Sequence, residues 1–218
     1  MTAAPSVPTL RDRAARHPAL VVAAIYLTAR VVTTLFIFIG VGMQERATGS
    51  ATTFENLSMR WDGQWYWLIA TQGYPATLPL DTAGNVTSNA WAFMPLYPWL
   101  SRAVAVVFGG AYPLAAILVA IGAGYGASLV LFRLLRERTG DTAALWAVAL
   151  FASGPLAALF QMGYAESLFL LWLFLALLAL VKRRYAWLYL FIPLMGFTRP
   201  GVLAFALMLG VYGTVRPM

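Results

Sequence analysis

Cysteine is absent from this chain of 218 residues, and histidine occurs only once, at His17. The lack of cysteine excludes disulfide bonds and thiolate metal sites, and a single histidine excludes a histidine-rich metal centre. Charged residues are also scarce, at 11% of the sequence, whereas 61% of the residues are hydrophobic. Because a soluble domain carries about 25% charged residues, this composition indicates an integral membrane protein.

The formal net charge of +7 does not indicate nucleic-acid binding. The basic residues stand at the ends of apolar segments, where they orient membrane helices. Arg11, Arg13 and Arg16 precede the first apolar segment, which runs from about residue 18 to 42. This segment is long enough to cross a bilayer and has no small-residue cleavage site near its end. We therefore expect a retained helix and a cytoplasmic N-terminus.

An outer loop is expected over residues 43–111. Its polar part, 43–91, holds four acidic residues and two arginines, which fits the outer face of a membrane. Two surface helices are expected in this loop, near 61–72 and 95–108. If 95–108 crossed the membrane instead, the basic clusters 133–138 and 182–184 would lie outside, against the positive-inside tendency.

The remaining apolar segments predict membrane helices throughout 112–215. They run near 112–132 and 141–160, then to about 181, and finally over 185–197 and 202–215. The sequence thus predicts one all-α transmembrane domain over 1–218, with about six membrane passes in the plasma membrane. On this topology Asp62, Glu166 and Arg199 all lie toward the outer face.

Asp62 stands in an aromatic segment with Trp61, Trp65 and Trp67 around it. A helix that starts near Asp62 would lie flat at the membrane surface and place the carboxylate at its positive end. Such a carboxylate can accept a proton from a reacting hydroxyl as a general base. The alternative is an aspartate that only caps the helix.

Four short motifs occur in a fixed order. They are Arg60-Trp-Asp-Gly-Gln-Trp-Tyr66, Ala92-Phe-Met-Pro-Leu-Tyr-Pro98, Tyr164-Ala-Glu-Ser-Leu-Phe169 and Thr198-Arg199. With these motifs the chain resembles the PIG-V-like mannosyltransferases, which are polytopic glycosyltransferases of the GT-C type. The eukaryotic members carry a histidine where Trp65 stands here, and family members are longer. We therefore expect a bacterial member, or an N-terminal fragment of one.

The resemblance implies an enzyme that transfers mannose from a polyprenyl-phosphate donor to a lipid-linked glycan or glycolipid. It places an acidic residue, here Asp62, at the start of the first surface helix, with the active site facing outward. Arg199 would bind the donor phosphate, and its alternative is an interface arginine that reaches lipid headgroups. Glu166 would orient a sugar hydroxyl or pair with Arg30 or Arg199. Arg30 itself lies within the first apolar segment, where a charge must face protein or water, so we expect a buried partner first and a phosphate contact second.

Further candidates for substrate binding surround Asp62, namely Arg60, Trp61, Trp65, Tyr66 and Tyr97. Aromatic rings of this kind stack on sugars or prenyl chains, although they also form belts at membrane interfaces. No cofactor is expected and no metal site is assigned. Outer-loop carboxylates could gather one divalent cation, but no ligand cluster is visible in the sequence.

Two alternatives to an active glycosyltransferase stay open. A transporter or flippase of a lipid-linked sugar would use the same aromatic and basic residues without bond cleavage. Such proteins tend to show internal repeats, and none is visible here. The second alternative is a non-catalytic fragment that assembles with another subunit.

Overall fold

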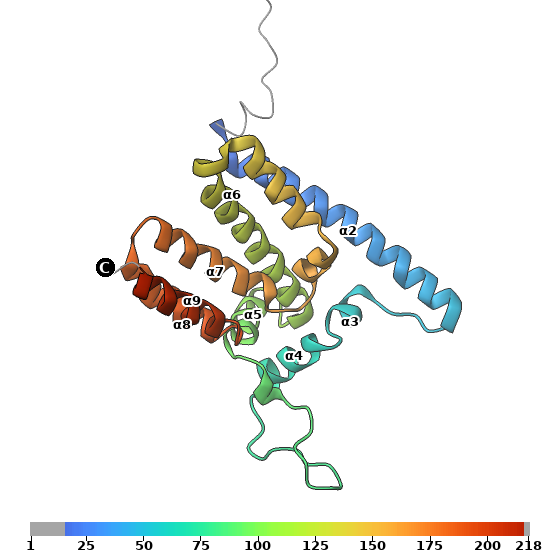
Figure 1. The fold of residues 1–218 in the computed structure, drawn as a ribbon. Helices are drawn as coiled ribbons and strands as arrows, with labels where there is room; N and C mark the ends of the chain where they lie inside the picture. Colours follow the sequence, from blue (N-terminus) through green and yellow to red (C-terminus); the bar gives the residue numbers. More distant parts are fainter. Residues whose placement is uncertain (1–15, 216–218) are drawn as a thin grey trace, which may run out of the picture.

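A computed structural model describes residues 16–215; Arg11 and Arg13 lie outside this range. The described chain is all-helical, and its one β-type pairing is an isolated bridge between Leu80 and Val86. The α-helices are α2 (Pro18–Thr48), α3 (Phe54–Ser58), α4 (Asp62–Gln72), α5 (Leu96–Val107), α6 (Tyr112–Ser153), α7 (Glu166–Val181), α8 (Leu188–Gly196) and α9 (Val202–Val215). Short 3-10 helices are η1 (Ala90–Ala92), η2 (Pro155–Gln161) and η3 (Tyr185–Trp187). Figure 1 shows their arrangement.

Two of these helices, α2 with 31 residues and α6 with 42, are long and apolar enough to cross a membrane. The pair η2 and α7 is bent by 103° and makes a third crossing if it is counted as one span. Length and apolarity thus support two or three spanning helices in the described residues. The sequence predicts about six passes, because it treats the two legs of α6 as separate helices and also includes the shorter apolar segments near 185–197 and 202–215.

Helix α6 is two helices joined at Gly140, where φ is 80° and ψ is 166°. Glycine adopts positive φ without the clash that a Cβ would cause. The chain reverses near this point, and the second leg returns beside α2 (Figure 1). Val22 of α2, Phe132 of the first leg and Val148 of the second share one buried cluster. The two legs match the expected helices 112–132 and 141–160 in place.

The second leg of α6 ends at Ser153, earlier than the expected residue 160. Gly154 is extended, and Pro155 then opens the 3-10 helix η2. Proline disfavours a helical conformation at the residue before it and lacks the N–H that would continue the helix. The break leaves backbone carbonyls at the end of α6 without helical partners.

Arg30 of α2 supplies donors to this broken helix end. Its side chain is only 5% exposed, and its guanidinium donates to the carbonyls of Ala152 and Ala157. It also lies over the ring of Phe160, 5.4 Å from the centroid. A cation is favoured at a helix C-terminus, where unpaired carbonyls are concentrated. Arg30 therefore has the expected buried partner, but the partner is this helix end and not Glu166.

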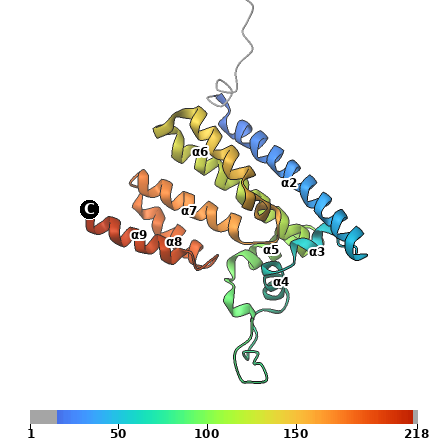
Figure 2. The ribbon, with the colours of Figure 1, turned by 45° about the vertical axis from the view of Figure 1, so that its right-hand side comes forward.

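Basic residues mark one end of the helical body. Lys182, at the end of α7, pairs with Glu137 beside the reversal of α6, and Arg136 pairs with Asp141 at 3.1 Å. The Tyr125 hydroxyl donates to the Ala19 carbonyl at 2.9 Å, which ties the first leg of α6 to the start of α2. Figure 2 shows the start of α2 and this reversal at the upper end, opposite the loop that carries α4.

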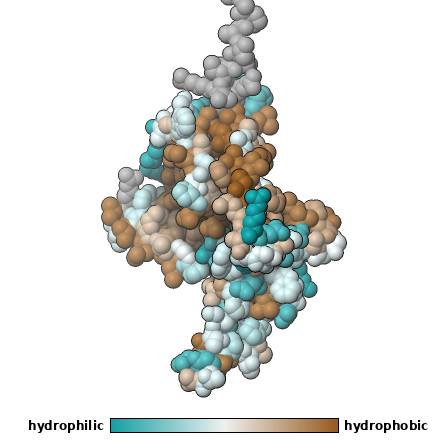
Figure 3. Space-filling model, turned by 90° about the vertical axis from the view of Figure 1, so that its right-hand side faces the viewer, coloured by the Kyte–Doolittle hydropathy of each residue, from teal (hydrophilic) through white to brown (hydrophobic). Residues whose placement is uncertain are grey.

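The segment expected to be a mostly polar outer loop, residues 43–111, is more helical than the sequence predicts. Helix α2 continues to Thr48, beyond the expected end at residue 42, and α3 follows. Helices α4 and α5 lie where helices near 61–72 and 95–108 were expected. Arg102 of α5 donates to the Ala70 carbonyl of α4 at 2.8 Å. Figure 3 shows apolar surface over the helical body and mostly polar surface over the loop below it.

Candidate functional site

The start of α4 is set by a tight reversal between α3 and α4. Trp61 has a φ of 49°, a left-handed conformation that is uncommon for a residue with a side chain. A Cβ on Gly63 would lie 2.6 Å from the Ser58 carbonyl oxygen, so only glycine fits this approach. Asp62 is the first residue of α4, and the N-cap position belongs to Trp61, which makes no side-chain capping bond. The Asp62 carboxylate is therefore not the helix cap that the alternative interpretation required.

The start of α7 is fastened to the same reversal. The Gly163 N–H donates to the Ser58 carbonyl at 3.2 Å, and the Tyr164 hydroxyl donates to the Arg60 carbonyl at 3.1 Å. Glu166, two residues after Tyr164, is the first residue of α7. These two bonds bring the first residues of α4 and α7, which are far apart in sequence, to one place.

Arg199 comes from the turn between α8 and α9. The Phe197 carbonyl accepts the N–H of Leu96, the first residue of α5, at 2.9 Å. Thr198 is fully buried and donates to the Leu194 carbonyl at 2.6 Å. At Gly201 a Cβ would lie 2.8 Å from the Phe169 ring, so the turn packs closely on α7. The turn is thus held by both α5 and α7.

Asp62, Glu166 and Arg199 meet as a group that we call the charged trio. Nη1 of Arg199 lies 2.5 Å from Oε1 of Glu166 and 3.9 Å from Oδ2 of Asp62. The side chains are 33%, 23% and 36% exposed for Arg199, Glu166 and Asp62, so solvent reaches the group. Oε2 of Glu166 is buried and makes no hydrogen bond to the described residues. Counted at their formal charges, the two carboxylates and the guanidinium carry a net charge of minus one.

Tyr66 and Tyr97 lie beneath the charged trio in the packed interior. Tyr66 is 2% exposed, and its ring centre is 5.3 Å from that of Phe93 and 5.1 Å from that of Tyr97. Burial raises the pKa of Tyr66 above its ordinary value, while the charge of Arg199 acts to lower it. The Tyr97 hydroxyl donates to the Ala116 carbonyl at 2.8 Å. Both tyrosines are placed to support the site from below.

The other expected residues lie at the edge of the site. Trp65 stacks on Phe93 with ring centres 6.0 Å apart, and Trp61 is 67% exposed. The Arg60 side chain donates to Thr52 at 3.3 Å, away from the partners of Arg199. Sequence reasoning missed the supporting roles of Phe93 and Tyr164, although both stand in the quoted motifs. It could not find Ser58, because that residue acts through its backbone carbonyl.

The described residues contain no group of three or more potential metal ligands. Asp81 is engaged in its own loop, where its carboxylate accepts from the backbone N–H groups of Ala83 and Asn85. Hydrogen bonds from Asn85 hold the pKa of Asp81 below its usual range. No metal role is assigned to Asp62 or Glu166 from this arrangement.

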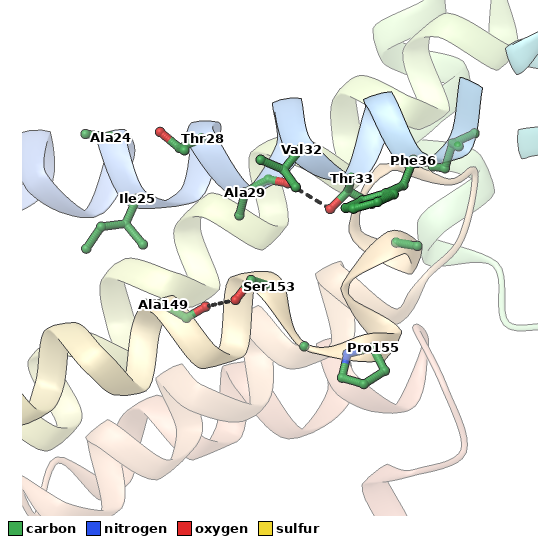
Figure 4. Close-up of a pocket in the computed structure, with 13 residues that line it drawn as sticks. Ala24, Ile25, Thr28, Ala29, Val32, Thr33, Phe36, Ala149, Ser153 and Pro155 are labelled. Carbon is green, nitrogen blue, oxygen red and sulfur yellow. Dashed lines mark hydrogen bonds between the residues drawn. The ribbon is translucent and has the colours of Figure 1, made fainter. Parts of the chain in front are cut away.

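An apolar groove of about 780 Å³ lies between α2 and the second leg of α6 (Figure 4). The hydroxyls of Thr33 and Ser153 on its walls donate to carbonyls of their own helices, at Ala29 and Ala149. These bonds leave mainly hydrocarbon facing the groove. None of the expected site residues lines it, so the groove and the charged trio are separate features.

No family model, curated protein or solved structure matches this chain.

Proposed function

We propose that this chain forms the catalytic part of a polytopic membrane glycosyltransferase. It would cross the plasma membrane six times, with a cytoplasmic N-terminus and the charged trio at the outer face. The donor would be a polyprenyl-phosphate sugar, and the acceptor a lipid-linked glycan or glycolipid. The choice of mannose rests on the resemblance to the PIG-V-like enzymes alone. The observation that carries the proposal is the convergence of Asp62, Glu166 and Arg199 from three separate segments.

The distribution of charge supports this topology. The Lys182–Glu137 pair joins the basic reversal of α6 to the end of α7, and the start of α2 lies at the same end of the body (Figure 2). Clusters of arginine and lysine favour the cytoplasmic side. The two legs of α6, together with α2, α7, α8 and α9, would then supply six passes. Of the shorter helices, α7 would be lengthened by the bent segment η2 and α8 by η3, and α9 would cross as a helix of 14 residues.

Asp62 would act as the general base. As the acceptor oxygen bonds to the anomeric carbon, the bond from that carbon to the phosphate oxygen breaks. The hydroxyl proton passes to the Asp62 carboxylate, and polyprenyl phosphate leaves with the electron pair. Asp62 suits this role because its carboxylate is partly exposed, is not the cap of α4, and lies 3.9 Å from its only cationic neighbour among the described residues.

Arg199 would hold the phosphate as its negative charge grows during bond cleavage. Nη1 makes the contacts with both carboxylates, and Nε and Nη2 form no hydrogen bond or ion pair with the described residues. An arginine presents these donors in a planar fork that suits phosphate oxygens. Glu166 would fix the orientation of that fork through its 2.5 Å contact with Nη1. It is thus a positioning residue for Arg199.

A transfer assay tests this function. Membranes containing the chain would be given radiolabelled polyprenyl-phosphate mannose and a host lipid extract, beside membranes without the chain. The proposal expects label in a new lipid only when the chain is present. Exposed Glu45, near the end of α2, offers a matched control for amide substitution of Asp62, because Glu45→Gln should transfer like wild type. Label that stays in the donor while crossing the bilayer would instead establish the flippase alternative.

A further inference from the structure

The end of the molecule formed by the reversal of α6 and the end of α7 has more basic side chains than acidic partners for them. Arg136 pairs with Asp141, and Lys182 pairs with Glu137. Besides Arg16 just before α2, four further arginines there are exposed and form no ion pair with any residue in the range 16–215, namely Arg133, Arg138, Arg183 and Arg184. We call these four residues the arginine surface. The Lys182–Glu137 pair joins its two halves, which lie on the first leg of α6 and after α7.

Arg183 occupies a position where an arginine is unexpected. Its φ of 55° is left-handed, and it directly follows Lys182, the C-cap of α7. Its N–H donates to the Leu180 carbonyl at 3.1 Å, which closes the helix end. Glycine is the usual residue at this point because a Cβ makes the left-handed conformation costly.

The reversal of α6 provides a comparison at the same end of the molecule. Its left-handed position is occupied by Gly140, with φ of 80°. With a ψ of 166°, Gly140 adopts a conformation that is essentially restricted to glycine, whereas the position after α7 carries an arginine at a φ of 55°. A strained position that keeps a bulky charged residue points to a use for that side chain.

We propose that the arginine surface binds the headgroups of anionic phospholipids in the adjacent leaflet. Clusters of about four to eight basic residues beside the end of a membrane helix are typical of segments that bind anionic lipid, and the arginine surface has four. Arginine donates in a planar fork that fits the phosphodiester of a headgroup. The surface lies at the opposite end of the body from the charged trio, so this proposal stands independently of the proposed function.

Native mass spectrometry of the purified full chain in dodecyl maltoside tests the proposal. The probes are dioleoyl-phosphatidylglycerol and dioleoyl-phosphatidylcholine, offered at equal concentration. We expect wild type to retain the anionic lipid in preference to the zwitterionic one. Arg183→Gly should weaken that retention about fivefold, which corresponds to about 1 kcal/mol for one cation at the surface. Arg183→Lys, which keeps the charge, should retain most of the preference.

The glycine variant also separates a loss of charge from a loss of fold. Because glycine relieves the left-handed strain, Arg183→Gly should unfold at the same or a higher denaturant concentration than wild type. Arg138→Gln provides a second variant at a position with ordinary helical geometry, and it should weaken anionic lipid binding by a similar factor. Equal retention of the two lipids by wild type would overturn the proposal. Displacement of the anionic lipid by inorganic phosphate, but not by chloride at equal ionic strength, would also overturn it, because the surface would then be a site for free phosphate.

Discussion

Nη1 of Arg199 contacts Oε1 of Glu166 at 2.5 Å, although 33 positions separate the two residues in sequence. This pair joins the start of α7 to the turn before α9 and places both beside Asp62, the first residue of α4. Each of these three positions is a helix start or an interhelical turn, held by backbone hydrogen bonds. The site therefore depends on how the helix ends are fastened together.

Coupling between Arg199 and Glu166 is the first expectation. Arg199→Leu leaves a partly buried carboxylate without its cation and should lower the free energy of unfolding by about 2 kcal/mol. The double variant Arg199→Leu, Glu166→Gln should lose less than the sum of the single losses, by about 1 kcal/mol. Unfolding in mixed micelles of increasing dodecyl sulfate content, followed by circular dichroism, measures both. Strictly additive losses would show that the 2.5 Å contact contributes no stability.

Arg30 should be important for stability because it supplies donors to the broken end of α6. Arg30→Met would leave the carbonyls of Ala152 and Ala157 without these donors in an apolar setting. We expect a loss of about 2–3 kcal/mol. Leu35, which is 58% exposed on the same helix, offers a control, because Leu35→Met should leave the unfolding midpoint unchanged. A midpoint for Arg30→Met equal to that of the control would contradict this role.

Gly63 should resist substitution because of the close approach of α3 and α4. The Cβ of Gly63→Ala would lie 2.6 Å from the Ser58 carbonyl, and relieving that overlap moves the helix that carries Asp62. We expect a loss of about 1–3 kcal/mol. Gly122 of α6 has nothing within 4 Å of an added Cβ, so Gly122→Ala should be neutral or stabilising. Thermal unfolding of the two variants in one detergent compares them, and equal midpoints would contradict the close approach.

Labelling of single cysteines should reveal the topology, since the chain has no native cysteine. Ala83→Cys in the exposed loop should react with a membrane-impermeant maleimide on intact cells. Thr139→Cys, beside the reversal of α6, should react only after the cells are permeabilised. The reverse pattern would place the basic end outside and contradict the proposed orientation.

Sequence patterns predicted the helical class and the place of most helices, because apolar runs and their charged ends are local signals. They missed where α6 ends, although Gly154 and Pro155 mark that break in the sequence. The donors that Arg30 supplies beside the break could not be predicted, because they come from a distant helix. The same patterns placed Asp62, Glu166 and Arg199 toward one face, but their meeting depends on contacts such as Tyr164 with the Arg60 carbonyl. The acceptors in such contacts are backbone carbonyls of distant segments. Every residue has a backbone carbonyl, so the sequence does not show which one is used.

The measurement that bears most directly on the account is the transfer assay with Asp62→Asn beside wild type. The amide is close in size to the carboxylate and does not remove a helix cap, so the variant should fold and insert normally. We expect it to lose transfer of labelled mannose by at least about 100-fold, as the loss of a general base predicts. Transfer by Asp62→Asn at the wild-type rate, from protein inserted at the wild-type level, would remove Asp62 from the mechanism and contradict the proposed site.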